Sequence, residues 1–212
     1  QLFAKNGVSI KNLNYRYAGS KKDVLQKINF QILPGQIIGV LGRIGSGKST
    51  LVNTLNHYLD VTPGSIFFGK QDLTKICDND LRTSIRTVTQ DPFLFSDTVE
   101  NNIIFAGADY ESVDPEHFRE ILTATALKSE VARFPKKEKT MVGEKGIMLS
   151  GGQKQRISLA RAILKPCDLL ILDNVLSAVD YETEAHLLRE MYKRIKPDNN
   201  RPPQAKSRLI VS

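Results

Sequence analysis

One carboxylate, Asp173, ends a run of apolar residues in the stretch LLILDNVLSAVD (Leu169–Asp180). Four apolar residues that lead directly into an acid are typical of a buried strand whose end presents a carboxylate. A carboxylate in that place is suited to hold Mg²⁺ through water beside a phosphate. The next residue, Asn174, carries an amide, which can orient a water molecule but cannot remove its proton.

The stretch GRIGSGKST (Gly42–Thr50) supplies the groups that such a phosphate would need. It fits the phosphate-binding loop pattern, because the apolar run IIGVLG precedes it and the helical pattern of KSTLVNTLNHYL (48–59) follows it. Glycines let backbone N–H groups surround the phosphates, Lys48 is a point charge for them, and the Ser49 hydroxyl can bind Mg²⁺. The residues expected to hold the nucleotide here are Gly42, Arg43, Gly45, Ser46, Gly47, Lys48, Ser49 and Thr50. In the helix we expect one apolar face, formed by Leu51, Leu55, Tyr58 and Leu59.

A second anion site is predicted at LSGGQ (Leu149–Gln153), where a serine and two glycines begin a long helical pattern. The free N–H groups and the dipole of a helix N-terminus attract negative charge. A single domain does not need two such helix ends for one nucleotide. We therefore expect the second end to meet the nucleotide of another copy or of a homologue.

The elements that position these groups alternate between strand and helix patterns. Strands are expected in VSIKNLNYRY, VLQKINFQIL, IIGVLG, SIFFGK, SIRTVTQ, LLILD and RLIVS, and a turn at Pro34-Gly35. From about residue 98 to 133 the pattern is helical and interrupts the alternation, and two more helices are expected, over 151–164 and 181–195. The sequence therefore predicts an α/β core with parallel strands and an inserted helical subdomain.

Composition limits the class of protein. The chain has 212 residues, 41% of them hydrophobic, which suits a globular domain and excludes a disordered chain. Its net charge of +7 permits nucleic acid, an anionic membrane surface or a phosphate ligand as a partner, or simply reflects a solvated basic face. Cys77 and Cys167 have no metal-ligand spacing, and both are expected to be small buried residues of a reduced, cytosolic protein.

With these motifs in order, the sequence resembles the nucleotide-binding domain of ABC transporters, and specifically of exporters. The resemblance covers essentially the whole chain. GRIGSGKST is similar to the Walker A loop, TQDPFLF to the Q-loop, LSGGQKQR to the signature, LLILD to Walker B and SAVD to the D-loop. TMVGEKG (140–146) is similar to the X-loop of exporters.

The resemblance implies a P-loop NTPase fold: a RecA-like core with an antiparallel β subdomain, plus an inserted α-helical subdomain. On the chain this places the core and β subdomain at 1–97 and 160–212, and the helical subdomain, with X-loop and signature, at about 98–159. It also implies a dimer around two Mg-ATP, in which the Walker A loop of one domain and the signature of the other hold each nucleotide. The partners are then a second nucleotide-binding domain and a transmembrane domain, at the cytoplasmic face of a membrane.

The resemblance also implies roles for individual residues. Tyr17 falls at the position whose aromatic ring stacks on adenine, although Tyr15 is an alternative and either could be only a strand residue. Gln90 would coordinate Mg²⁺ and sense the membrane domain, and Glu144 would face the membrane domain's coupling helices. From the partner's side, the nucleotide would meet Ser150, Gly151, Gly152 and Gln153.

The sequence departs from the family at Asn174, where a glutamate normally polarises the attacking water. ATP binding should survive because Lys48, Ser49, Gln90 and Asp173 are present, whereas hydrolysis at this site should be slow. Our leading hypothesis is the degenerate half of a heterodimeric or fused exporter, whose intact signature serves the partner's site. A deliberate Glu-to-Asn substitution that traps ATP, or a homodimer that tolerates asparagine, are the alternatives.

Two expectations concern the chain beyond its motifs. It is expected to be a piece of a longer polypeptide, since RLIVS is similar to the strand that leads into the family's switch histidine. The main alternative function is an ATPase that acts on nucleic acid, but those relatives carry a coiled coil between Walker A and signature, and no heptads are found here. Nucleic acid is therefore not an expected partner. The transported substrate is not encoded in these residues.

Overall fold

The computed structural model describes residues 7–105, 113–143, 146–194 and 205–211. The chain forms two compact units. The first holds Gln1–Thr87, Cys167–Asp173 and Ala205–Ser212, and the second holds Val88–Pro166 and Asn174–Gln204. The subdomain boundaries expected from the sequence stay a prediction.

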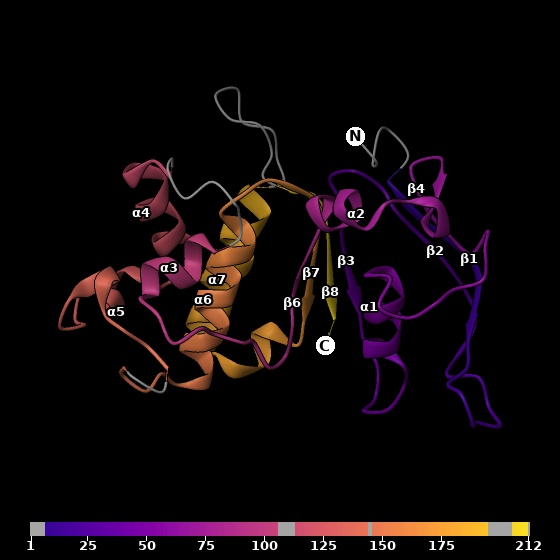
Figure 1. Cartoon of the computed structure of the whole chain (residues 1–212), viewed down its shortest axis with the longest axis horizontal. Coiled ribbons are helices and arrows are strands. Elements are labelled where there is room, and N and C mark those ends of the chain that lie inside the picture. The colour runs from indigo at the N-terminus through magenta and orange to yellow at the C-terminus, as the bar shows by residue number, and fades with distance from the viewer. Residues whose placement is uncertain (1–6, 106–112, 144–145, 195–204, 212) are drawn as a thin grey trace. The chain divides into compact units, whose positions relative to one another are not determined.

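A four-stranded antiparallel sheet forms one part of the first unit (Figure 1). Its strands, in the order β2-β1-β4-β5, are β2 (Leu25–Ile32), β1 (Val8–Tyr15), β4 (Ile66–Phe68) and β5 (Gln71–Asp72). Val8 pairs with Ile32 on one side and with Phe68 on the other, and all three side chains are fully buried. The alternation of apolar and polar residues in β1 therefore sets this register.

A second sheet in the first unit contains β3 (Ile37–Val40), β8 (Ala205–Val211), β7 (Cys167–Asp173) and β6 (Ile85–Val88), in that order. β8 runs parallel to both β3 and β7, which confirms the predicted α/β core. β7 is apolar on both faces, as expected for a parallel strand in the middle of a sheet. Helix α1 (Lys48–Leu55) lies between this sheet and the antiparallel strands in Figure 1, and Leu51 and Leu55 belong to the core that they share.

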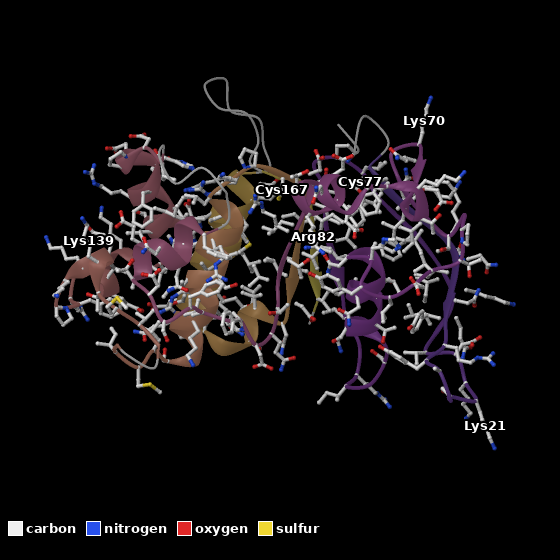
Figure 2. The ribbon with its side chains drawn as sticks, viewed as in Figure 1. Lys21, Lys70, Cys77, Arg82, Lys139 and Cys167 are labelled. Carbon is white, nitrogen blue, oxygen red and sulfur yellow. The ribbon has the colours of Figure 1, made fainter. Side chains whose placement is uncertain are left out.

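Two short helical segments complete the first unit, η1 (Leu73–Lys75) and α2 (Asp78–Ser84). The residue before α2, Cys77, is exposed, so the expectation that both cysteines are buried is wrong for Cys77 and right for Cys167 (Figure 2). Exposure follows from the position of Cys77 as the residue preceding a helix that begins with acidic residues. Lys21 and Lys70 are exposed and point outward into solvent (Figure 2).

Helix α1 is shorter than the sequence pattern indicates. It ends at Leu55, and Tyr58 is 69% exposed, so the expected face of Leu51, Leu55, Tyr58 and Leu59 is wrong beyond Leu55. His57 has φ of 56°, and its N–H donates to Thr54 O, while the N–H of Tyr58 donates to Asn53 O. This is the hydrogen-bond pattern of a Schellman ending, which a left-handed residue closes.

The second unit is mainly helical. It contains α3 (Val99–Ile104), α4 (Pro115–Ala124), α5 (Lys128–Val131), η2 (Lys137–Lys139), α6 (Gly151–Ile163), η3 (Val175–Ala178) and α7 (Tyr181–Lys193). The helices predicted between about 98 and 133 and after 150 are thus confirmed. α6 contacts both α3 and α4, and α4 also contacts α7. Side-chain caps begin four of these helices: Thr98, Asp114, Ser150 and Asp180 each accept a backbone N–H.

Within the described residues, no helix is both long enough and apolar enough to span a bilayer.

Candidate nucleotide-binding site

The glycine loop joins β3 to α1 in the first unit. Gly45 and Gly47 have φ of 80° and 95°, a left-handed conformation that glycine adopts without strain. A side chain on Gly47 would also approach Val24 and Leu25 at 3.1 Å. The loop is folded into a turn by the N–H of Ser46, which donates to Arg43 O at 3.1 Å. The glycines therefore permit a tight loop whose backbone faces the start of α1.

The ammonium group of Lys48 lies inside this loop. Its Nζ donates to Gly42 O at 2.6 Å and to Arg43 O at 3.1 Å. No side chain caps α1, and its first turn contains no acid, so the positive end of the helix is not neutralised locally. The exposed Ser49 hydroxyl lies in the same turn. This arrangement of an ammonium, free helix N–H groups and a hydroxyl is suited to bind a phosphate.

Asp173 is the last residue of β7, a strand that contacts α1. Burial raises the pKa of its carboxyl, and the positive charge of Lys48 partly opposes that rise. Among the described residues no group of three or more His, Cys, Asp or Glu could hold a metal ion. Mg²⁺ at this place would be held by Asp173, Ser49 and phosphate oxygens, as is usual for Mg²⁺ bound with a nucleotide.

The expected adenine-stacking residue, Tyr17, is 41% exposed and lies after the end of β1. Its hydroxyl forms a hydrogen bond of 3.1 Å with the Thr50 hydroxyl in α1. The Tyr15 ring contacts that of Tyr17 edge-on, with centroids 5.0 Å apart, and itself packs against the core. The exposed ring of Tyr17 is thus held against the phosphate loop's helix, whereas Tyr15 is committed to packing.

The remaining expected site residues belong to the second unit. Gln90 is exposed, and its main-chain oxygen accepts a hydrogen bond from Gln155 of α6 at 3.0 Å. A cavity of about 540 Å³ lies beside it and is lined by Gln90, Asp91, Pro92, Phe93, Gly151, Lys154, Gln155 and Ser177. The first unit thus brings together Tyr17, the glycine loop and Asp173, and the second brings Gln90 close to the start of α6.

Asn174 begins the second unit's segment after β7. It has φ of 54° and ψ of 28°, a left-handed conformation that asparagine tolerates better than most residues. Its main-chain oxygen accepts a hydrogen bond from the Ser177 hydroxyl at 2.9 Å. The amide at the expected base position therefore lies on a tight turn that leads into η3.

The LSGGQ segment forms the N-terminus of α6. Ser150 is the N-cap, and its side chain and that of Gln153 exchange hydrogen bonds with each other's backbone N–H in a capping box. The amides of Gly151 and Gly152 are the first of the helix and have no carbonyl behind them. The Ser150 hydroxyl, which accepts in the cap, can still donate its proton. A phosphate from outside the chain can thus be bound without breaking the cap.

Sequence reasoning missed two residues of this region, Gln155 and Arg161, which bind the main chain of the Q-loop from α6. Arg161 could have been noticed as a charged residue within the apolar run Leu159–Ile163, whereas Gln155 stands among the polar residues Gln153–Arg156 and gave no such signal. Glu144, expected in the X-loop, lies outside the described residues.

Comparisons with known proteins agree with this geometry. The family model for the ABC transporter matches residues 25–177. The chain is 42% identical over 186 residues to the multidrug resistance-like ATP-binding protein MdlA of Buchnera aphidicola, covering 87% of the chain and 32% of that protein. It is 40% identical over 182 residues to the ATP-dependent lipid A-core flippase of Vibrio parahaemolyticus, covering 85% of the chain and 31% of that protein.

A similar solved structure is that of a bacterial Atm1-family ABC exporter with ATP bound, with a TM-score of 0.86 and 27% identity. The likeness covers 99% of this chain and 35% of that one. The chain thus spans about a third of the length of these relatives.

The fold and the phosphate loop define a P-loop NTPase, which confirms the predicted fold class. The chain belongs to the ABC transporter family, as the ATPase domain. The resemblance inferred from the sequence is therefore confirmed.

Proposed function

We propose that this chain binds Mg-ATP and, with a second nucleotide-binding domain, drives export by a transmembrane domain at the cytoplasmic face of a membrane. The phosphate loop carries the proposal: Lys48 is enclosed by loop carbonyls at the uncapped end of α1. Relatives named for multidrug resistance and for lipid A-core flipping support an exporter.

Within the site, Gly42–Thr50 hold the phosphates and Tyr17 stacks on adenine. Ser49 and Gln90 bind Mg²⁺ directly, and Asp173 binds it through water. Asn174 orients water without removing a proton, so hydrolysis at this Walker site is slow. Ser150–Gln153 serve the nucleotide of the partner domain, whose own glutamate completes the hydrolytic site.

Binding of Mg-ATP by the chain, followed with a fluorescent ATP analogue, tests the proposal. Wild type should bind, and Lys48→Ala should weaken binding by at least about tenfold, because it removes a charge-assisted contact to phosphate. Lys70→Ala is the matched control, since it removes the same charge from an exposed position that points into solvent. Equal binding by all three proteins would contradict the proposed site.

A further inference from the structure

The Q-loop segment, defined here as Gln90–Phe95, is bound to α6 through its main chain. Gln155 Nε2 donates to Gln90 O at 3.0 Å, and Arg161 Nη1 donates to Phe93 O at 3.0 Å. Both acceptors are backbone oxygens, so these bonds fix the path of the segment without using the Gln90 side chain. The exposed Gln90 side chain borders the cavity beside the segment.

The end of the segment is held by Asn102 of α3, which is fully buried. Its amide donates to Phe95 O at 3.0 Å and accepts from Phe95 N at 2.8 Å. Arg161 in turn donates to Asn102 O at 2.7 Å and to Asn102 Oδ1 at 3.2 Å. Arg161 therefore ties both Phe93 and the Asn102 support to α6.

The buried side chain of Gln155 uses only one of its two polar atoms in a hydrogen bond to the described residues. Its side chain is 4% exposed, and its Oε1 is buried without a hydrogen-bond partner among the described residues. A buried acceptor without a partner lowers stability, so the bond to Gln90 O is retained at a cost to the fold.

The same helix begins with the Ser150 cap and the free amides of Gly151 and Gly152. Gln155 lies just over one turn from that end, so the Q-loop segment and the signature end of α6 are joined through one short piece of helix. A movement of the helix therefore carries Gln90 with it. Such a contiguous hydrogen-bonded network is a physical route for coupling between two ligand contacts.

We propose that Gln155 is a positioning residue that fixes Gln90 relative to the signature end of α6. Binding of a nucleotide phosphate at that end and binding of Mg²⁺ by Gln90 then favour each other, because coupling between two binding sites is reciprocal. This inference rests on the proposed function, in which Gln90 binds Mg²⁺.

Gln155→Met is the test variant, because methionine has a similar volume but cannot donate to Gln90 O. Lys154→Met is the matched control, since it makes the same replacement at the next, exposed residue, which borders the same cavity. Affinities are measured for Mg-ATP and for ATP in EDTA. Gln155→Met should weaken Mg-ATP binding by about tenfold, equal to about 1.4 kcal/mol, and leave Mg-free binding unchanged.

A purely structural defect would weaken both affinities, so an equal loss, or no loss, overturns the proposal. Gln90→Ala should show the same split, and the double variant Gln90→Ala/Gln155→Met should lose no more than either single variant. Additive losses would also overturn it. If Gln155→Met does not fold, Gln155→Leu, whose side chain also lacks a donor, decides by the same criteria.

Hydrogen exchange separates this inference from the proposed function. Without nucleotide, Gln155→Met should speed exchange in the Q-loop segment by about tenfold while peptides of α6 keep their wild-type rates. Unchanged exchange in the segment overturns the inference whatever the nucleotide does. Failure of the wild type to bind Mg-ATP overturns the proposed function, and the exchange result then still decides whether Gln155 positions Gln90.

Discussion

At the scale of single residues, the main chain around Asn174 favours the residue that is present. Its φ of 54° lies in the left-handed region, where asparagine is tolerated because its short amide can hydrogen-bond locally. Glutamate lacks that advantage. Position 174 thus combines a side-chain amide that cannot act as a general base with a left-handed backbone that suits asparagine.

Replacing Asn174 with glutamate should therefore have two opposite effects. Turnover should rise by about 10²-fold or more, because a carboxylate can act as a general base. The free energy of unfolding should fall by about 1 kcal/mol, because the new residue is strained in the left-handed conformation. Phosphate release measures the first effect and urea unfolding measures the second. An Asn174→Gln variant controls for side-chain length, and a wild type that already turns over at typical enzyme rates would contradict the proposed slow site.

The ionised carboxylate of Asp173, which is proposed to bind Mg²⁺, lowers the stability of the nucleotide-free fold. Burial raises the pKa of its carboxyl, with Lys48 opposing the rise, so the folded state favours the protonated form more than the unfolded state does. The ionised carboxylate is then a cost to the fold that grows as pH rises from about 3.9, its unfolded value, through the raised folded value. Removing the charge relieves that cost only where the wild-type residue is ionised.

Asp173→Asn should therefore raise the melting temperature of the nucleotide-free chain at pH 7, and raise it less at pH 4.5. The same variant should lose the additional stabilisation that Mg-ATP gives to wild type, because the Mg²⁺ contact is gone. Thermal unfolding at the two pH values, with and without Mg-ATP, measures both effects. A lower melting temperature at pH 7 without nucleotide would show that the carboxylate stabilises the fold.

At the scale of elements, sequence patterns predicted most helices and strands, including the helical stretch from residue 98, but they missed α2 and β5. They failed at the end of α1, where apolar residues continue past the point at which His57 turns left-handed. Apolar periodicity alone cannot detect this helix end, because the end depends on particular hydrogen bonds. The N–H of Tyr58 donates to Asn53 O, and the Thr87 hydroxyl donates to the side chain of Asn56.

Some residues of the candidate site could likewise be predicted from the sequence, and others could not. The phosphate loop and Asp173 could be predicted, because their chemistry depends on residue types at fixed spacing beside a strand. The roles of Gln155 and Arg161 could not, because they bind backbone oxygens 65 and 68 residues away. Nothing in the sequence near either residue specifies such a distant acceptor.

A partly buried ion pair connects two elements of the second unit. Arg156 of α6 donates to Glu130 of α5, and their side chains are 9% and 31% exposed. Glu130→Leu should reduce the free energy of unfolding by about 3 kcal/mol, because it leaves the arginine charge buried without its anion. Arg156→Met should cost less, since Glu130 can reach water.

The double variant Glu130→Leu/Arg156→Met should recover part of the loss, because it leaves neither charge unpaired. Urea unfolding of the four proteins gives the coupling between the two residues. Strictly additive losses would mean that each side chain contributes by packing alone.

At the scale of the whole molecule, the two anion-binding helix ends belong to different compact units, and the proposed function assigns them to two different nucleotides. A substitution at Gly151 can block phosphate binding by the signature without destabilising the fold. A Cβ at this position would meet nothing within 4 Å, and an acid in the first turn of a helix is favourable, so Gly151→Asp should not destabilise the chain. Its carboxylate should nevertheless repel a partner's phosphate.

Complementation between the wild type and one double variant tests whether two copies of the chain form each hydrolytic site together. Wild type has an intact signature but asparagine at position 174, and the variant Asn174→Glu/Gly151→Asp has the glutamate but a blocked signature. Each protein alone should hydrolyse ATP slowly, because every site in its homodimer lacks either the base or the signature. In a mixture, the variant's Walker loop should meet the wild-type signature and form one competent site in each mixed dimer. Phosphate release should then exceed the sum of the separate rates by about 10²-fold, the contribution of a general base.

The control is the mixture in which Lys48→Ala is added to the variant, since this removes ATP from the competent site only. If cross-linking shows mixed dimers and the first mixture is still no faster than its components, the signature does not act in trans and Asn174 does not mark a division of labour between two domains.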